Sequence, residues 1–112
     1  MSINQYYEYI ESHFQESIKL EDISKAASIS HSSLTQLFKD EIGLTPVAYL
    51  WKYRIIVAKK HLAFTNLPIK DIALRCGFKT VPHFCRKFEK YTRKTPTEFR
   101  EKSLAARKAA FL

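Results

Sequence analysis

The sequence has few of the residues on which tight turns depend. Its 112 residues include two glycines and four prolines. Turns between short strands draw heavily on both residue types, and no convincing alternation of apolar and polar residues indicates a strand. The composition therefore favours a helical protein. The scarcity of glycine also argues against a glycine-rich loop that could hold the phosphates of a nucleotide.

Long apolar runs are absent as well. No stretch approaches the ~20 consecutive apolar residues of a transmembrane helix. The first residues, MSINQYYEYIE, lack the basic segment and apolar run of a secretory signal. The chain has only two cysteines, so we expect free thiols in a reducing, cytoplasmic compartment. Hydrophobic residues make up 46% of the chain, which is enough to form a folded core.

Positive charge is abundant but unevenly placed. The net charge is +8, and it divides into −4 for residues 1–45 and +12 for residues 46–112. The second part should therefore dominate any attraction to a polyanion. Charge alone does not distinguish nucleic acid from an acidic membrane or an acidic protein.

Apolar residues recur with helical spacing along the whole chain. The sequence predicts an all-α fold of seven helices. Thr45-Pro46 and Thr95-Pro96 have the form of helix starts, with threonine as the N-cap and proline as the first helical residue. Gly43 is expected to end a helix. The expected helices cover about residues 3–14, 20–27, 31–42, 46–64, 69–76 and 80–91, and a seventh begins at 96.

The chain contains an internal repeat. Phe38 stands seven residues before Thr45-Pro46, and Phe88 stands seven residues before Thr95-Pro96, so the two copies are offset by 50 residues. Upstream of these anchors the offset is 49, which places one extra residue in the second copy. Each copy consists of a short helix, a turn and a longer helix. This is the helix-turn-helix pattern, in which the second helix lies in the major groove of DNA.

A helical wheel separates a buried side from an outward side in the longer helix of the first copy. Leu34 and Phe38 define the buried side. Ser32, Gln36 and Lys39 point in roughly the opposite direction, with Asp40 and Ser33 on one flank and Thr35 on the other.

The longer helix of the second copy has the same arrangement. Four residues are expected to face inward: Val81, Phe84, Phe88 and Tyr91. Pro82, Arg86, Glu89 and Lys90 lie on the outward side, flanked by His83. Arg86 is therefore the repeat equivalent of Gln36. Glutamine matches the N6/N7 edge of adenine, and arginine matches the O6/N7 edge of guanine. The alternatives are an ordinary exposed residue for Gln36 and a phosphate contact or a surface ion pair for Arg86.

Several motifs resemble the DNA-binding domain of the AraC/XylS transcription regulators. The second copy contains IKDIALRCGF at 69–78 and F-x-R-x-F at 84–88, followed by Thr95-Pro96. The first copy contains LEDISKAASISHSSL at 20–34 and LFKDEIG at 37–43. The resemblance covers about residues 3–100. Three departures affect the base preference more than the fold: Gln36 stands where arginine is common, Pro82 where serine is common, and Arg93 where glycine is usual.

The resemblance implies two homeodomain-like helix-turn-helix subdomains, residues 1–45 and 65–112, joined by a linker helix at 46–64. It also implies a bacterial transcription regulator that binds double-stranded DNA sequence-specifically and reads successive major grooves. A helix of that length spans roughly 28 Å, and successive grooves lie roughly 34 Å apart. One chain could then bind an asymmetric site without dimerising. RNA polymerase is a further candidate partner, and no membrane or cofactor is expected.

The positions at which the family contacts DNA bases can be matched to this sequence one residue at a time. They assign base reading to Ser32, Thr35, Gln36, Val81, His83 and Arg86. Candidates for phosphate contacts are Lys39, Lys79, Thr80, Lys87, Lys90 and Lys94, for which solvated surface is the alternative. Arg54 is expected to brace the linker helix through an ion pair rather than to contact DNA, and Trp51 to pack between the subdomains rather than to act as a stacking platform.

Other functional classes fit less well. The four histidines are scattered and form no evident catalytic triad, so we expect no enzyme. Cys76, His83 and Cys85 have no fourth ligand at zinc-type spacing, so we expect no metal site, and thiol redox control stays open. A basic helical adaptor for an acidic protein is the main rival. The two units account for the chain, which is either a small regulator or the DNA-binding part of a longer one.

Overall fold

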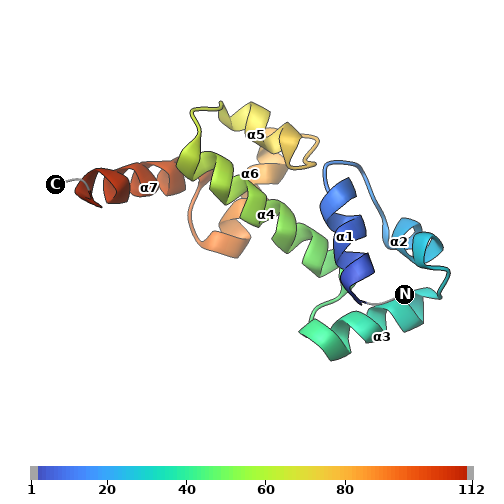
Figure 1. Ribbon diagram of the computed structural model, residues 1–112. Coiled ribbons are helices and arrows are strands. Elements are labelled where there is room, and N and C mark those ends of the chain that lie inside the picture. The colour runs from blue at the N-terminus through green and yellow to red at the C-terminus, as the bar shows by residue number, and fades with distance from the viewer. Residues whose placement is uncertain (1–2, 111–112) are drawn as a thin grey trace. The chain divides into compact units, whose positions relative to one another are not determined.

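A computed structural model describes residues 3–110, and within them it contains seven α-helices and no strands (Figure 1). This confirms the expected all-α class. The starts of all seven helices and the ends of the first six match the expected ones to within one residue. The helices are α1 Ile3–His13, α2 Leu20–Ala27, α3 His31–Ile42, α4 Pro46–Phe64, α5 Ile69–Arg75, α6 Val81–Thr92 and α7 Pro96–Ala110.

The chain forms two compact units that divide between Tyr53 and Arg54, inside α4. The first unit comprises α1, α2, α3 and the beginning of α4. The second comprises the rest of α4 with α5, α6 and α7. None of the helices within residues 3–110 is long and apolar enough to cross a membrane.

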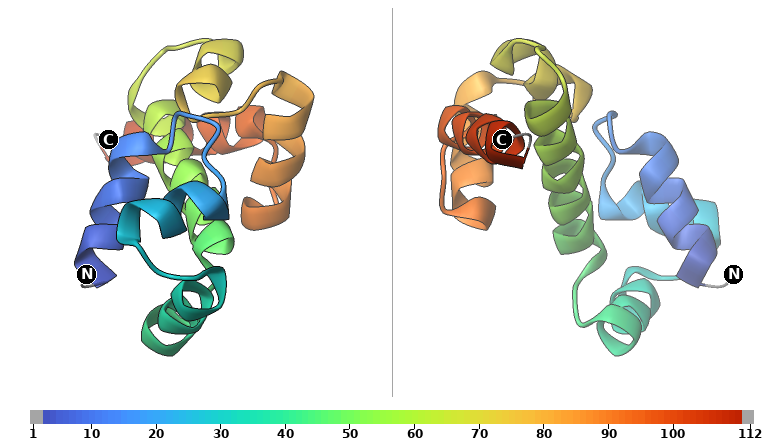
Figure 2. Two further views of the ribbon diagram at one scale, coloured as in Figure 1. Left: turned by 90° about the vertical axis from the view of Figure 1, so that its right-hand side faces the viewer. Right: turned by 60° about the vertical axis from the view of Figure 1, so that its left-hand side comes forward.

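The core of the first unit lies among α1, α2 and α3, which pack against one another in pairs (Figure 2). Leu34 and Phe38 of α3 are fully buried in it, as the helical wheel predicts. The ring of Phe38 meets Tyr7 edge-on, with 6.0 Å between ring centroids. Replacing such a buried phenylalanine with alanine costs about 3–5 kcal/mol, so this side of α3 is strongly fixed. The buried cluster consists of Tyr6, Ile10, Ile23, Ala27, Leu34, Phe38 and Leu50.

A chain of aromatic rings fixes α6 in the second unit. Phe84 contacts Phe78 at 5.1 Å and Phe88 at 5.7 Å between ring centroids. Phe88 in turn meets Phe99 of α7 edge-on at 5.5 Å. Because Phe84 and Phe88 are both fully buried, the opposite side of α6 is left for solvent or a partner.

The repeat in the sequence is also a repeat in the structure. Phe38 lies 5.9 Å from Tyr49, and their equivalents 50 residues later, Phe88 and Phe99, lie 5.5 Å apart between ring centroids. The first residue of α3 follows that of α2 by 11 residues, and the first residue of α6 follows that of α5 by 12. The extra residue therefore falls where the change of offset predicts it.

Threonine caps begin α4 and α7 as expected. Thr45 Oγ1 accepts a hydrogen bond from the Ala48 amide at 3.1 Å, and Thr95 Oγ1 accepts one from the Glu98 amide at 3.1 Å. Gly43 ends α3 in the left-handed region, with φ of 72°. Arg93 occupies the equivalent place after α6 with φ of 64°, where a side chain is disfavoured.

Arginines of α7 satisfy backbone carbonyls at the end of α4. Arg100 donates from Nε to Leu62 O at 3.2 Å and from Nη2 to Thr65 O at 3.3 Å. Arg107 donates to Ala63 O, and its guanidinium lies 5.7 Å from the centre of the Phe64 ring. The last carbonyls of a helix lack partners within the helix and carry partial negative charge, so these cations stabilise the α4–α7 pairing.

One expected inward residue is exposed. Tyr91 is 38% exposed. It follows Phe88 by three residues, which places it about 60° from the buried direction, and α6 ends one residue later. Val81, at the other end of the helix, is half-buried.

Candidate nucleic-acid interface

The turn between α2 and α3 is held by backbone and side-chain hydrogen bonds. Ser28 adopts a left-handed conformation with φ of 56°, and the Ile29 amide donates to Ser24 O at 3.1 Å. Ser30 then caps α3, because its Oγ accepts from the Ser33 amide at 3.1 Å. These bonds set the direction in which α3 leaves the turn, and therefore which side chains it presents.

The expected reading residues of the first unit lie together on the outward side of α3. Ser32 and Gln36 are exposed, Thr35 is half-buried, and Lys39 is exposed one turn further on. Their spacing of three and four residues places neighbouring members on one face of the helix. The face is short and polar at its N-terminal end, which suits entry into a groove.

Gln36 has a partner on its own helix that is not among the expected contacts. Its Nε2 donates a hydrogen bond to Asp40 Oδ1 at 2.7 Å, and both side chains are exposed. The helical wheel places Asp40 on the flank of this face. The spacing of four residues between an amide and a carboxylate was the signal that could have revealed the pair.

The N-terminus of α6 is capped by Thr80. Its Oγ1 accepts from the His83 amide at 3.2 Å, and Pro82 occupies the first helical turn. Proline has no backbone N–H, and that of His83 is already bonded to Thr80. The N-terminal end of α6 therefore offers fewer free amide donors to an anion than a helix start without proline does.

Three expected reading residues of the second unit lie on α6. Arg86 is exposed, whereas Val81 and His83 are half-buried. The ring of His83 meets Phe78 edge-on, with 5.5 Å between ring centroids. His83 therefore has one side packed against the unit, which limits its freedom to move.

The protonation of His83 is set by its surroundings. Partial burial and the neighbouring cations Lys87, Arg86 and Arg54 hold the pKa of the His83 imidazole below its ordinary value of 6.5. Near neutral pH the ring is uncharged and offers one donor and one acceptor. Such a ring can hydrogen-bond to a base edge without adding to the positive charge of α6.

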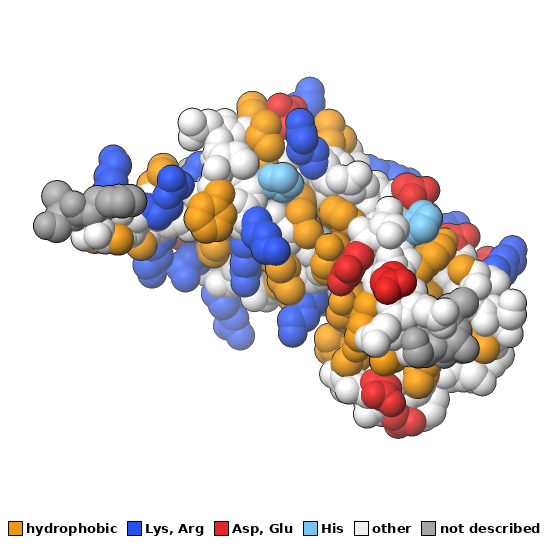
Figure 3. All heavy atoms as spheres, viewed as in Figure 1, with side chains coloured by type: hydrophobic (Ala, Val, Ile, Leu, Met, Phe, Trp, Pro, Cys, Tyr) orange, Lys and Arg blue, Asp and Glu red, His pale blue; other side chains and the backbone are white. Residues whose placement is uncertain are grey.

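The expected phosphate-binding residues concentrate in the second unit. Lys79, Thr80 and Lys90 are exposed, and Lys87 and Lys94 are half-buried. The sequence from Arg54 onward carries 15 Lys and Arg residues against four acidic ones, whereas the part up to Tyr53 carries four Lys against seven. The difference is visible in Figure 3, where lysine and arginine side chains are prominent around α7 and acidic side chains lie over α1.

Arg54 and Cys76 lie in the interior of the second unit. Arg54 is 4% exposed and Cys76 is fully buried. Burial lowers the pKa of Arg54 and raises the pKa of the Cys76 thiol to about 12, although the Arg54 charge acts on the thiol in the opposite direction. A thiol with so high a pKa is a poor nucleophile. The burial of Arg54 favours a structural role over contact with DNA, and the ion pair expected of it stays a prediction.

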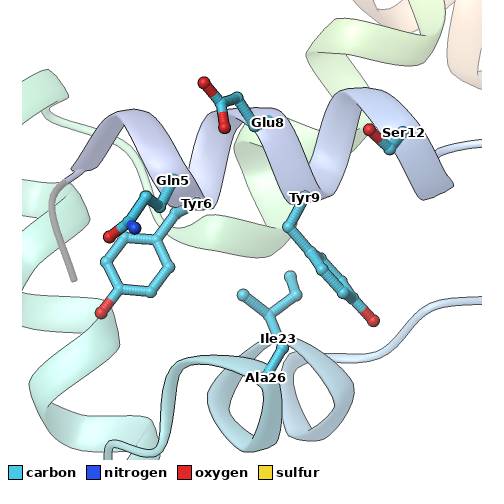
Figure 4. Close-up of a pocket in the computed structure, with 7 residues that line it drawn as sticks. All are labelled: Gln5, Tyr6, Glu8, Tyr9, Ser12, Ile23 and Ala26. Atoms are coloured by element: carbon cyan, nitrogen blue, oxygen red, sulfur yellow. The ribbon is translucent and has the colours of Figure 1, made fainter.

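Two further findings concern metal ligands and cavities. Within residues 3–110, no three His, Cys, Asp or Glu side chains gather as metal ligands would. A hollow of about 330 Å³ lies between α1 and α2 (Figure 4). It is lined by Gln5, Tyr6, Glu8, Tyr9, Ser12, Ile23 and Ala26, none of which belongs to α3.

The two units define a double helix-turn-helix protein, in which each unit presents a polar face on the second helix of its pair. A family described as "Helix-turn-helix domain" matches residues 23–102. The chain belongs to the AraC-type family of helix-turn-helix domains, which confirms the resemblance seen in the sequence.

Solved structures of this kind share the fold. An AraC-type transcriptional regulator from Chromobacterium violaceum is 29% identical with a TM-score of 0.82, and the match covers 89% of each chain. The DNA-binding domain of AdpA, a global transcriptional factor solved in complex with a target DNA, has a TM-score of 0.87. That match covers 93% of this chain and 94% of AdpA's at 21% identity.

Curated relatives are longer than this chain. A helix-turn-helix-type transcriptional regulator of Staphylococcus aureus (strain MSSA476) is 37% identical over 98 residues, which cover 88% of this chain and 13% of the relative. AdaA of Bacillus subtilis (strain 168), a bifunctional transcriptional activator and DNA repair enzyme, is 38% identical over 96 residues. That match covers 86% of this chain and 46% of AdaA.

Proposed function

We propose that this chain is a transcription regulator that binds double-stranded DNA sequence-specifically, with α3 and α6 in successive major grooves. The observation that carries the proposal is the pair of equivalent polar faces on these helices. Each face lies opposite two buried anchors, Leu34 and Phe38 in α3 and Phe84 and Phe88 in α6. The complex of AdpA with a target DNA is an example of the same fold bound to DNA.

The residues proposed to contact DNA have two different tasks, and both helices contribute to each. Base edges are read by Ser32, Thr35, Gln36, Val81, His83 and Arg86. Phosphates are bound by Lys39, Lys79, Thr80, Lys87, Lys90 and Lys94. Because Gln36 and Arg86 favour different bases, the site on DNA is asymmetric. Both units belong to one chain, which therefore binds the site as a monomer. Contact with RNA polymerase and action at the bacterial nucleoid, in the cytoplasm, are parts of the same proposal.

Selection from a pool of random duplexes tests the proposal. Bound duplexes would be recovered and sequenced at a low and a high salt concentration. Enrichment of an asymmetric motif, sharper at high salt because non-specific phosphate attraction is then weaker, is the expected result. A chain that acts as an adaptor for an acidic protein would enrich no motif at either concentration.

The two central reading residues should not contribute equally. Arg86→Ala should weaken binding to the selected site by about 1–3 kcal/mol, because a bidentate contact with guanine is lost. Gln36→Ala should cost less, since its unit lacks the surplus of positive charge. Quantitative gel-shift titrations give both values. Lys108→Ala, on the exposed end of α7, is the control and should bind as the wild type does. A larger loss for Gln36→Ala than for Arg86→Ala would contradict the ranking.

A further inference from the structure

The hydrogen bond between Gln36 and Asp40 ties a reading residue to an acidic neighbour. The Nε2–Oδ1 distance is 2.7 Å, and both side chains are exposed on α3. Asp40 stands in the last turn of α3, where the helix dipole disfavours a negative charge. It also brings negative charge to a face expected to approach phosphates. An acid in this place lowers both helix stability and DNA affinity. We therefore consider a different role for Asp40, in the choice of base.

We propose that Asp40 is a positioning residue that makes Gln36 select adenine over guanine. The proposal rests on the function proposed above, in which α3 enters the major groove. It concerns one base position in the first unit's half of the site.

The argument follows from the hydrogen-bonding groups of a primary amide. Glutamine has one acceptor oxygen and two N–H donors on one nitrogen. Adenine presents an acceptor at N7 and a donor at N6, whereas guanine presents acceptors at both N7 and O6. With one N–H of Gln36 held by Asp40, the amide turns one remaining N–H and its oxygen outward. That pair complements adenine and sets the amide oxygen against O6 of guanine.

The second unit provides a contrast at the equivalent positions. Fifty residues after Asp40 stands Lys90, which has no acceptor and repels a neighbouring cation. Lys90 therefore cannot hold the Arg86 guanidinium as Asp40 holds the Gln36 amide. Arg86 needs no such constraint, since all its hydrogen-bonding groups are donors and already match the two acceptors of guanine.

The charge of Asp40 and its acceptor oxygen have separable effects. The negative charge weakens attraction to every duplex, whereas the oxygen acts only on the choice of base. Asp40→Asn removes the charge and keeps an oxygen at Oδ1. Asp40→Ala removes both. Loss of the bond in Asp40→Ala should therefore lower selectivity while overall affinity is unchanged or rises, a combination that simple damage to the fold does not produce.

The experiment measures dissociation constants for duplexes that carry each of the four bases at one position. That position is the one whose preference disappears in Gln36→Ala. The wild type should prefer adenine to guanine there by about 5- to 150-fold, the range of one bidentate contact. Asp40→Asn should keep most of this ratio and bind all four duplexes more tightly. Asp40→Ala should reduce the ratio to within about threefold.

Glu41→Gln is the matched control, because it removes the neighbouring exposed acid of α3 without touching the Gln36 bond. It should keep the adenine preference. Helix content and thermal unfolding of each variant confirm that it folds.

Two results for the Asp40 variants would overturn the inference. One is an Asp40→Ala variant that retains the wild-type ratio. The other is an Asp40→Asn variant that loses the ratio as fully as Asp40→Ala does. If a motif is selected but Gln36→Ala alters no position in it, the inference fails and the proposed function stands. A wild type that selects no motif overturns both.

Discussion

His83 is both a packing residue and a candidate reading residue. Its ring rests edge-on against Phe78, and it shares α6 with Arg86 and Lys87. The sequence predicts its place on the flank of the outward face. It does not predict the packing, because Phe78 lies in the turn before α6 and the course of that turn is set by tertiary contacts. The only indication of this packing in the sequence is the pair Gly77-Phe78, which places a turn and an aromatic ring shortly before α6.

The lowered pKa of His83 gives folding stability a pH dependence. The unfolded chain binds a proton with the ordinary histidine pKa of about 6.5, and the folded chain binds it less readily. Stability is therefore fully present above about pH 6.5 and decreases as the pH falls toward the folded-state pKa. Urea unfolding at pH 7.5 and 5.5 should show a smaller difference for His83→Gln than for the wild type.

His31→Gln provides the comparison for that measurement. His31 is exposed at the first position of α3. This variant should keep the wild-type difference between the two pH values. If His83→Gln also keeps it in full, the assignment of the effect to His83 is wrong.

The helix ends are the elements that the sequence predicts best. Threonine before proline marks the starts of α4 and α7, and the structure places a cap hydrogen bond at each. These signals are local, so they do not depend on how the chain folds around them. The hydrogen bonds from Arg100 and Arg107 to the end of α4 join residues 35 to 44 positions apart. No periodicity or motif in the sequence indicates a contact of that kind.

Equivalent helix ends in the two units should respond in opposite ways to substitution. Gly43 and Arg93 both adopt the left-handed conformation, which glycine tolerates and other residues resist. Gly43→Ala should lower the free energy of unfolding by about 1 kcal/mol through backbone strain alone, since an added Cβ would have no atom within 4 Å. Arg93→Gly should raise it by up to about 1 kcal/mol. Chemical denaturation followed by circular dichroism gives both values.

The control for Arg93 removes its charge and keeps its Cβ. Arg93→Gln should leave the free energy of unfolding close to that of the wild type. If Arg93→Gln stabilises the protein as much as Arg93→Gly does, charge repulsion rather than backbone conformation is the cause.

At the scale of the whole molecule, the dominant feature is the uneven charge of its two units. The surplus of lysine and arginine begins at Arg54, where the second unit begins. This asymmetry could be predicted from the sequence, because it needs only a count along the chain. The spacing of four residues indicates that Gln36 and Asp40 are neighbours, but it does not predict the orientation of the Gln36 amide, because that depends on the rotamers that both side chains adopt.

Affinity for DNA should depend steeply on salt. If about six phosphates are neutralised, the logarithm of the association constant should fall with the logarithm of salt concentration with a slope of roughly −5. Lys90→Gln should reduce the steepness by about 0.9, the contribution of one phosphate contact. Fluorescence anisotropy over a range of salt concentrations measures these slopes.

A lysine outside the expected interface tests whether that effect is specific to position. Lys108, on the exposed end of α7, carries the same charge. Lys108→Gln should leave the slope nearly unchanged. Equal changes for Lys90→Gln and Lys108→Gln would mean that only the total charge matters.

The unequal burial of the two cysteines has a practical consequence. Cys76 is fully buried with a thiol pKa of about 12, whereas Cys85 is half-buried and adjoins Arg86 on α6. Burial and Glu89 raise the pKa of the Cys85 thiol as well, but its partial exposure makes it the cysteine that a thiol-directed dye should label first in the native chain. Cys85 is thus a natural labelling position beside the helix face proposed to bind DNA. The fluorescence of a dye at this position can distinguish the DNA-bound chain from the free chain.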